Sequence, residues 1–151
     1  WEPQKVIFQA VDVARELMDI QDVAIYITGG SVGYLRLAAA SSEEARQMGK
    51  SIHADENFFM HRELVERAVY RNREVDSVLP SYACGIYDRE NLSAVIMLWT
   101  KDLSKINLYE SNMLALICRL IESAMNRAAT YWNRLANQYI EGTNVLRFKA
   151  E

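Results

Sequence analysis

Hydrophobic residues recur with helical spacing near both ends of the chain. After Pro3, whose missing amide N–H suits the first turn of a helix, apolar residues three and four apart predict an amphipathic helix of about four to five turns. The same spacing predicts a second helix over residues 108–139. At 1.5 Å per residue this helix is about 48 Å long, whereas a globule of this chain length has a diameter of about 38 Å. We therefore expect its last turns to project from the body.

Apolar and polar residues alternate in the middle of the chain, which predicts β-strands. Residues 22–28 and 34–40 flank a Gly-Gly turn and indicate a hairpin. Residues 82–87 and 92–99 flank a polar turn and indicate a second hairpin. The segment 92–99 is apolar on both faces, which is typical of a central strand covered by helices. A short strand is also predicted at 74–77.

Two further helices are predicted between the hairpins. Ser41 and Glu44 have the spacing of a capping box, so a short helix should run to about Met48. Apolar positions three and four apart predict another helix over residues 59–71. The element order predicts an α+β fold with a central antiparallel sheet of about five to six strands. We expect the N- and C-terminal helices to pack on one face and the middle helices on the other.

The composition is that of one globular domain. The chain has 151 residues, of which 50% are hydrophobic, and a net charge of −3, which argues against nucleic acid as a partner. No uncharged apolar stretch is long enough to cross a membrane, and we expect no signal peptide in this segment. Cys84 and Cys118 lie in apolar runs without CxxC spacing, which predicts two buried thiols in a reducing compartment. We therefore expect a cytoplasmic location, either as a cytoplasmic protein or as the cytoplasmic part of a membrane-anchored one.

The ends of the sequence indicate a piece of a longer protein. It begins without a methionine and ends without a terminating signal. We expect a globular domain over residues 1–127. Residues 128–151 would continue the terminal helix and link it to a downstream segment.

No catalytic or metal-binding motif is evident. His53 and His61 are the two histidines, and their spacing matches no zinc signature. The glycines at 29, 30 and 33 precede a predicted strand rather than a helix, so they do not form a phosphate-binding loop. No Ser-His-Asp order or paired-carboxylate motif points to catalysis. We therefore predict a protein without enzymatic activity and without a metal, and no motif identifies a cofactor.

The second hairpin and the helix after it resemble the GAF domain family. That family closes with an apolar strand, a polar turn, a second apolar strand, a short linker and a helix of the pattern F-x-x-x-(D/E)-x-x-L-L. The corresponding segments here are 82–87, 88–91, 92–99 and the run from Ile106 through Glu110 to Leu114. Among GAF domains, the middle and final helices look most like those of PelD-type regulators of bacterial exopolysaccharide synthesis.

The resemblance implies a sensory or regulatory domain with a pocket between the sheet and the middle helices. A small anionic or aromatic ligand would suit the aromatic and basic residues expected near that pocket. These residues are Tyr26, Arg36, Phe58, Phe59, Tyr82 and Tyr87. A ligand-free homodimerisation or scaffolding module is an alternative, as is a regulatory appendage of a membrane-associated sugar-nucleotide enzyme.

The apolar stripe on the terminal helix predicts a homodimer formed by the first and last helices. A partner helix would cover the part of the stripe that projects from the body. Alternatively, the first helix could cover it within one chain. The residues expected at the interface are Ile7, Val11, Ala128, Trp132 and Leu135.

Overall fold

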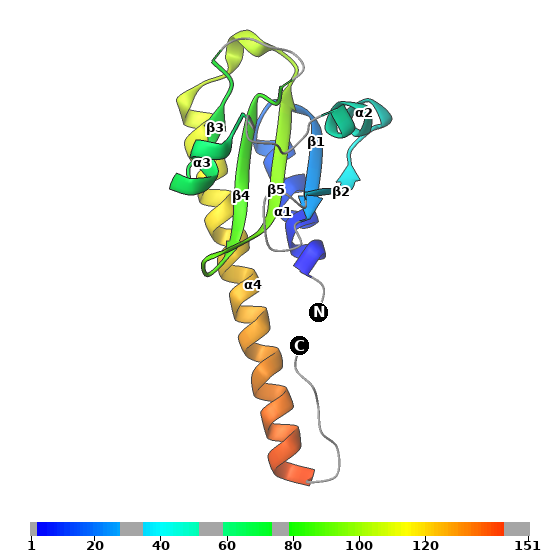
Figure 1. Ribbon diagram of the computed structural model, residues 1–151, viewed down its shortest axis with the longest axis vertical. Coiled ribbons are helices and arrows are strands. Elements are labelled where there is room, and N and C mark those ends of the chain that lie inside the picture. The colour runs from blue at the N-terminus through cyan, green and yellow to red at the C-terminus, as the bar shows by residue number, and fades with distance from the viewer. Residues whose placement is uncertain (1–2, 28–34, 52–58, 74–78, 144–151) are drawn as a thin grey trace.

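The computed structural model describes residues 3–27, 35–51, 59–73 and 79–143 (Figure 1). Side chains from residue 128 onward, and those of Ile7 and a few others in the first helix, are outside this description. The elements in chain order are α1 (Pro3–Leu17), β1 (Ile20–Ile27), β2 (Arg36–Ala40), α2 (Glu43–Ser51), α3 (His61–Glu66), β3 (Tyr70–Arg71), β4 (Tyr82–Asp88), β5 (Asn91–Thr100), the 3₁₀ turn η2 (Leu103–Lys105) and α4 (Leu108–Thr143).

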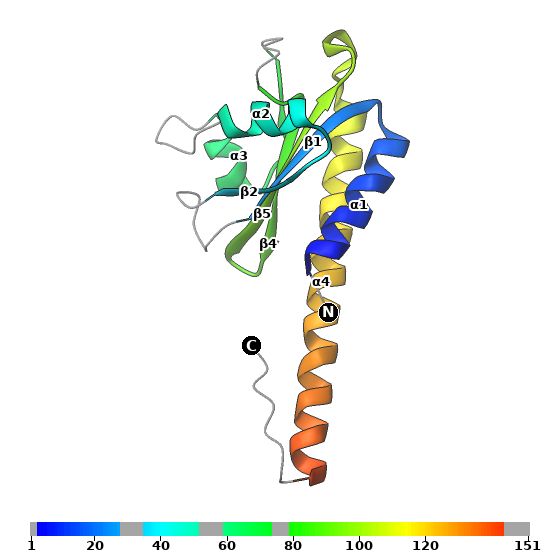
Figure 2. The same ribbon diagram turned by 90° about the vertical axis from the view of Figure 1, so that its right-hand side faces the viewer.

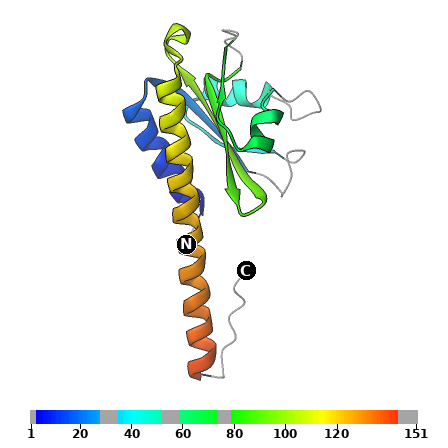
Figure 3. The ribbon, with the colours of Figure 1, turned by 90° about the vertical axis from the view of Figure 1, so that its left-hand side faces the viewer.

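The strands form one antiparallel sheet in the order β2-β1-β5-β4-β3. The apolar strand β5 lies at the centre, as its sequence predicts. Helices α1 and α4 lie side by side on one face, and α2 and α3 lie on the other (Figures 2 and 3). This arrangement confirms the predicted α+β fold.

Each face of the sheet has its own hydrophobic layer. The layer under α1 and α4, which we call the α1/α4 layer, includes Val11, Met18, Tyr82, Ile96 and Leu114. The layer under α2 and α3, the α2/α3 layer, includes Tyr26, Met60, Tyr87, Met97 and Trp99. Alternate residues of each strand point to opposite faces, so adjacent residues of β5 serve both layers.

The helix predicted over residues 59–71 is shorter than expected. Helix α3 ends at Glu66, because Arg67 adopts a left-handed conformation (φ 56°, ψ 35°) and its N–H donates to the carbonyl of Glu63. Tyr70 and Arg71 then pair with β4 as the edge strand β3. Pairing with β4 outweighs the helical propensity of these residues, as tertiary context often does. The strand predicted at 74–77 lies outside the described residues.

The prediction of two separate thiols is wrong. Cys84 of β4 and Cys118 of α4 are both buried and form a disulfide that joins the sheet to the helix. The two residues are 34 positions apart in sequence. They meet because Cys84 points toward the α1/α4 layer and Cys118 lies on the buried side of α4.

Helix α4 is longer than the body on which it packs, as predicted. Its 36 residues correspond to about 54 Å at 1.5 Å per residue. It continues unbroken past Arg127 and projects well beyond the sheet (Figure 1). Within the described residues, no helix is both long enough and apolar enough to cross a membrane.

Candidate functional site

The beginning of α4 is fastened to the sheet by a hydrogen-bonded network. The Tyr82 hydroxyl accepts a hydrogen bond from the Asn107 N–H (2.9 Å) and donates one to Glu110 Oε1 (3.0 Å). Asn107 Oδ1 caps the helix by accepting the Glu110 N–H at 2.8 Å. Burial raises the pKa of Tyr82 to about 12, so its hydroxyl stays protonated and able to donate.

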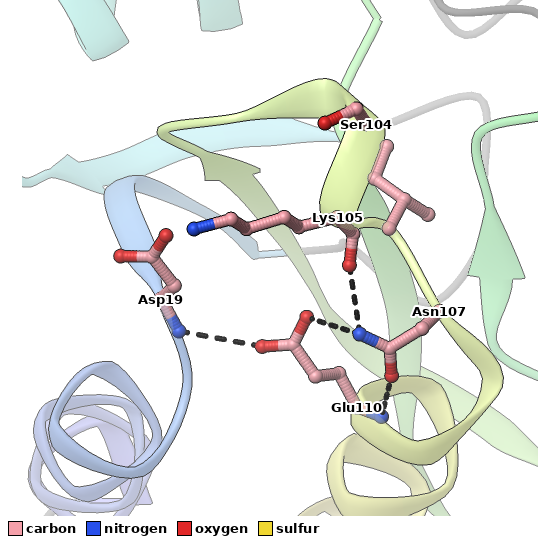
Figure 4. A pocket seen from close by; sticks show the side chains of 6 residues that line it. Asp19, Ser104, Lys105, Asn107 and Glu110 are labelled. Carbon is pink, nitrogen blue, oxygen red and sulfur yellow. Dashed lines mark hydrogen bonds between the residues drawn. The ribbon is translucent and has the colours of Figure 1, made fainter.

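The same network also holds the turn that follows α1. Glu110 Oε2 accepts a hydrogen bond from the backbone N–H of Asp19 at 3.3 Å, and Asn107 Nδ2 donates to Glu110 Oε1 at 3.1 Å (Figure 4). Glu110 therefore contacts the sheet through Tyr82 and the turn between α1 and β1 through Asp19. The first turn of α4 cannot shift without disturbing both.

Two tyrosines fasten the helices of the opposite face. The Tyr26 hydroxyl donates to the Gly49 carbonyl of α2 at 2.6 Å, and the Tyr87 hydroxyl donates to the Leu64 carbonyl of α3 at 2.5 Å. Burial raises the pKa of both hydroxyls, that of Tyr26 to about 12. Both side chains therefore fill the α2/α3 layer and hold its helices.

The residues predicted to bind a ligand do not gather in one place. Tyr82 lies in the α1/α4 layer, on the opposite side of the sheet from Tyr26 and Tyr87. Arg36 is exposed on the edge strand β2. Phe59 packs edge-to-face against Tyr70, with ring centroids 4.7 Å apart, and Phe58 lies outside the described residues.

A groove of about 700 Å³ lies where α3, the edge strand β3 and the first turn of α4 meet. We call it the edge groove. Phe59 lines it, together with residues that the sequence analysis did not single out, among them Tyr70, Arg71, Arg73 and Leu108. Arg71 was missed because it fell at the end of the helix predicted over residues 59–71. Arg73 lies two positions beyond it, after β3, and the sequence analysis gave it no role.

The outer faces of α1 and α4 expose large apolar side chains. Val13 and Leu17 of α1 are 51% and 61% exposed, and Leu116 and Leu120 of α4 are both 67% exposed. Each pair is four residues apart, on the side of its helix away from the sheet. We call these four residues the outer apolar face.

Val11 does not belong to this face. It was expected at a dimer interface, but it is 6% exposed and lies in the α1/α4 layer, within the chain's own core. It lies on the buried side of α1 with Ala14 and Met18. The side chains of Ile7, Ala128, Trp132 and Leu135 lie outside the description, so their place at an interface stays a prediction.

Comparison with known proteins supports the fold assignment. No protein family and no curated protein matches the sequence. A crystal structure of a GAF domain/HD domain protein from Geobacter sulfurreducens is similar, with a TM-score of 0.60 and 15% sequence identity. The similarity covers 83% of this chain and 94% of that one. The fold of this chain is therefore the GAF-like fold that its closing hairpin and helix resemble.

Proposed function

We propose that this chain is a non-catalytic regulatory domain of a larger protein, which senses a small ligand and transmits its occupancy through α4. The observation that supports this most directly is the construction of α4. Its first turn is held by Tyr82 and Asp19 through Glu110, and its later turns project beyond the sheet. A continuous helix conveys a displacement at one end to the other, because its backbone hydrogen bonds keep it rigid.

The mechanism is a shift between two positions of α4. A ligand changes the populations only by as much as its affinities for the two positions differ, and about 1.4 kcal/mol shifts the ratio tenfold. A binding site that contacts the first turn of α4 can supply such a difference. A ligand bound elsewhere, with equal affinity for both positions, would change nothing.

The domain is proposed to act as a homodimer. The outer apolar face consists of Leu116 and Leu120 on α4 and Val13 and Leu17 on α1, two helices in contact with each other, so two copies could bury it in a bundle of four helices. By helical periodicity, the predicted stripe through Trp132 and Leu135 follows Ile121 rather than Leu116 and Leu120, so it would form a second contact along the projecting part of α4.

Light scattering at high micromolar concentration tests the dimer. The wild-type chain should be dimeric, and Leu116→Glu/Leu120→Glu should be monomeric with an unchanged circular dichroism spectrum. Val65→Glu is the matched control, because Val65 is 72% exposed on α3, on the opposite side of the sheet. A monomeric wild-type chain would contradict the proposal, as would unfolding of the double variant but not of the control.

A ligand-free scaffold is the second candidate. The contacts that Tyr26 and Tyr87 make with backbone carbonyls favour it, because these side chains support helices rather than line an empty pocket. Thermal unfolding in the presence of small metabolites separates the two functions. A ligand that binds the folded chain raises the unfolding midpoint, and a scaffold shows no such response.

The wider setting proposed is a bacterial exopolysaccharide or signalling protein. The resemblance of the middle and final helices to PelD-type regulators supports the exopolysaccharide setting. Transmembrane helices encoded upstream in the full-length gene would agree with it. A sugar-nucleotide enzyme encoded upstream would instead make this domain its regulatory appendage.

A further inference from the structure

We propose that the edge groove is a binding site for a small organic anion, one that carries a carboxylate or phosphate group on an apolar or aromatic body. This inference extends the proposed function by naming a site and a ligand class. The binding measurement that tests it does not depend on whether the chain dimerises.

The size and the apolar walls of the groove suit a small molecule. Its volume of about 700 Å³ is within the range of about 300–1,000 Å³ that is typical of small-molecule sites. Phe59 and Tyr70 pack edge-to-face on the α3 side, and Leu79 and Leu108 add aliphatic surface. An aromatic or aliphatic ligand body would be desolvated against these side chains.

The charges of the groove favour an anion. Arg62 is already neutralised by Glu66, with Nε and Oε1 3.2 Å apart. Arg71 and Arg73 line the groove from β3 and the residues after it, and among the described residues neither forms an ion pair with a carboxylate. Glu63 is the remaining charged residue of the lining, so the groove carries one net positive charge. Guanidinium groups are suited to carboxylate and phosphate oxygens because they can donate two parallel hydrogen bonds.

The position of the groove connects it to the output helix. Leu108 and Ser111 of the first α4 turns form part of its wall. Arg71 is close enough to Tyr82 to lower the pKa of that hydroxyl, against the larger effect of burial. An anion bound by Arg71 would therefore act beside the Tyr82–Asn107–Glu110 network. Phe59 and Tyr70 lie at the margin of the α2/α3 layer, whereas Arg71, opposite Tyr82 in the pairing of β3 with β4, lies toward α4.

The test is isothermal titration calorimetry with phenyl phosphate, benzoate, inorganic phosphate and the neutral benzyl alcohol as probes. Phenyl phosphate or benzoate should bind, and benzyl alcohol should bind at least about tenfold more weakly, because it cannot accept charge-assisted hydrogen bonds. Inorganic phosphate should also bind more weakly than phenyl phosphate, because it lacks the apolar body.

Variants assign the binding to the groove. Arg71→Gln/Arg73→Gln should weaken phenyl phosphate binding by about tenfold for each arginine. Arg36→Gln is the matched control, an exposed arginine on the opposite edge strand, and should bind as the wild type does. Unchanged melting of the unliganded variants verifies their fold. The proposal is overturned if no anionic probe binds at millimolar concentration, if the double variant binds normally, or if Arg36→Gln alone abolishes binding.

Discussion

Breaking the Cys84–Cys118 disulfide should lower the stability of the chain substantially. The bond closes a loop of 34 positions that contains β5 and the start of α4. In the chain-entropy model, a loop of this length restricts the unfolded chain enough to stabilise the fold by about 3.8 kcal/mol at 25 °C. With an unfolding entropy of about 2.1 cal/mol/K per residue, this corresponds to a midpoint about 12 °C lower in the reduced chain.

Thermal unfolding with and without a phosphine reductant measures this difference, and thiol titration in denaturant verifies the redox state. The oxidised chain should show no free thiol and the reduced chain two. Cys84→Ala/Cys118→Ala is the control and should melt at the same temperature under both conditions. The reasoning fails if the untreated chain contains two free thiols, or if complete reduction leaves the midpoint unchanged.

Two further predictions concern the buried tyrosines. Tyr82→Phe removes the hydroxyl that bridges Asn107 and Glu110, so urea unfolding should show a free energy of unfolding lower by about 1–3 kcal/mol. Tyr109, which is 72% exposed, supplies the control. An equal loss in Tyr109→Phe would contradict the role of the Tyr82 hydroxyl. The pKa values of Tyr26 and Tyr82 rise from 10.0 to about 12 on folding, so the fold favours the neutral hydroxyls. Their contribution to stability is present below pH 10 and is lost as the pH rises toward 12. Urea midpoints measured on either side of pH 10 should show this decline in stability. An equally steep decline in the Tyr26→Phe/Tyr82→Phe variant would refute the assignment of the effect to these two hydroxyls.

The closing part of the chain could be predicted well because its signals are local. The uninterrupted apolar run of β5 indicates a strand covered on both faces, and it lies at the centre of the sheet. The long apolar periodicity after Leu108 indicates a helix that outlasts the body, and α4 runs to Thr143. Both features depend on the spacing of residues within one element, which the sequence states directly.

The candidate site could be predicted only in part. The aromatic residues were identified, but Tyr82 was grouped with Tyr26 and Tyr87. Tyr82 and Tyr87 lie five positions apart on β4, so strand alternation already places them on opposite faces of the sheet. Which helices cover each face, and therefore which layer each tyrosine joins, depends on contacts between distant segments that the residue types do not state.

The sequence by itself determined which segments are helices and strands in most of the chain, and that the last helix exceeds the body in length. Periodicity and capping are properties of neighbouring residues, so they can be recognised in the sequence without knowledge of the fold. Only the tertiary structure decided that Arg67 ends α3, that Tyr70 and Arg71 form an edge strand, and that Cys84 meets Cys118. These outcomes depend on pairing with β4 and packing of α4, contacts between residues far apart in the chain that no local pattern encodes.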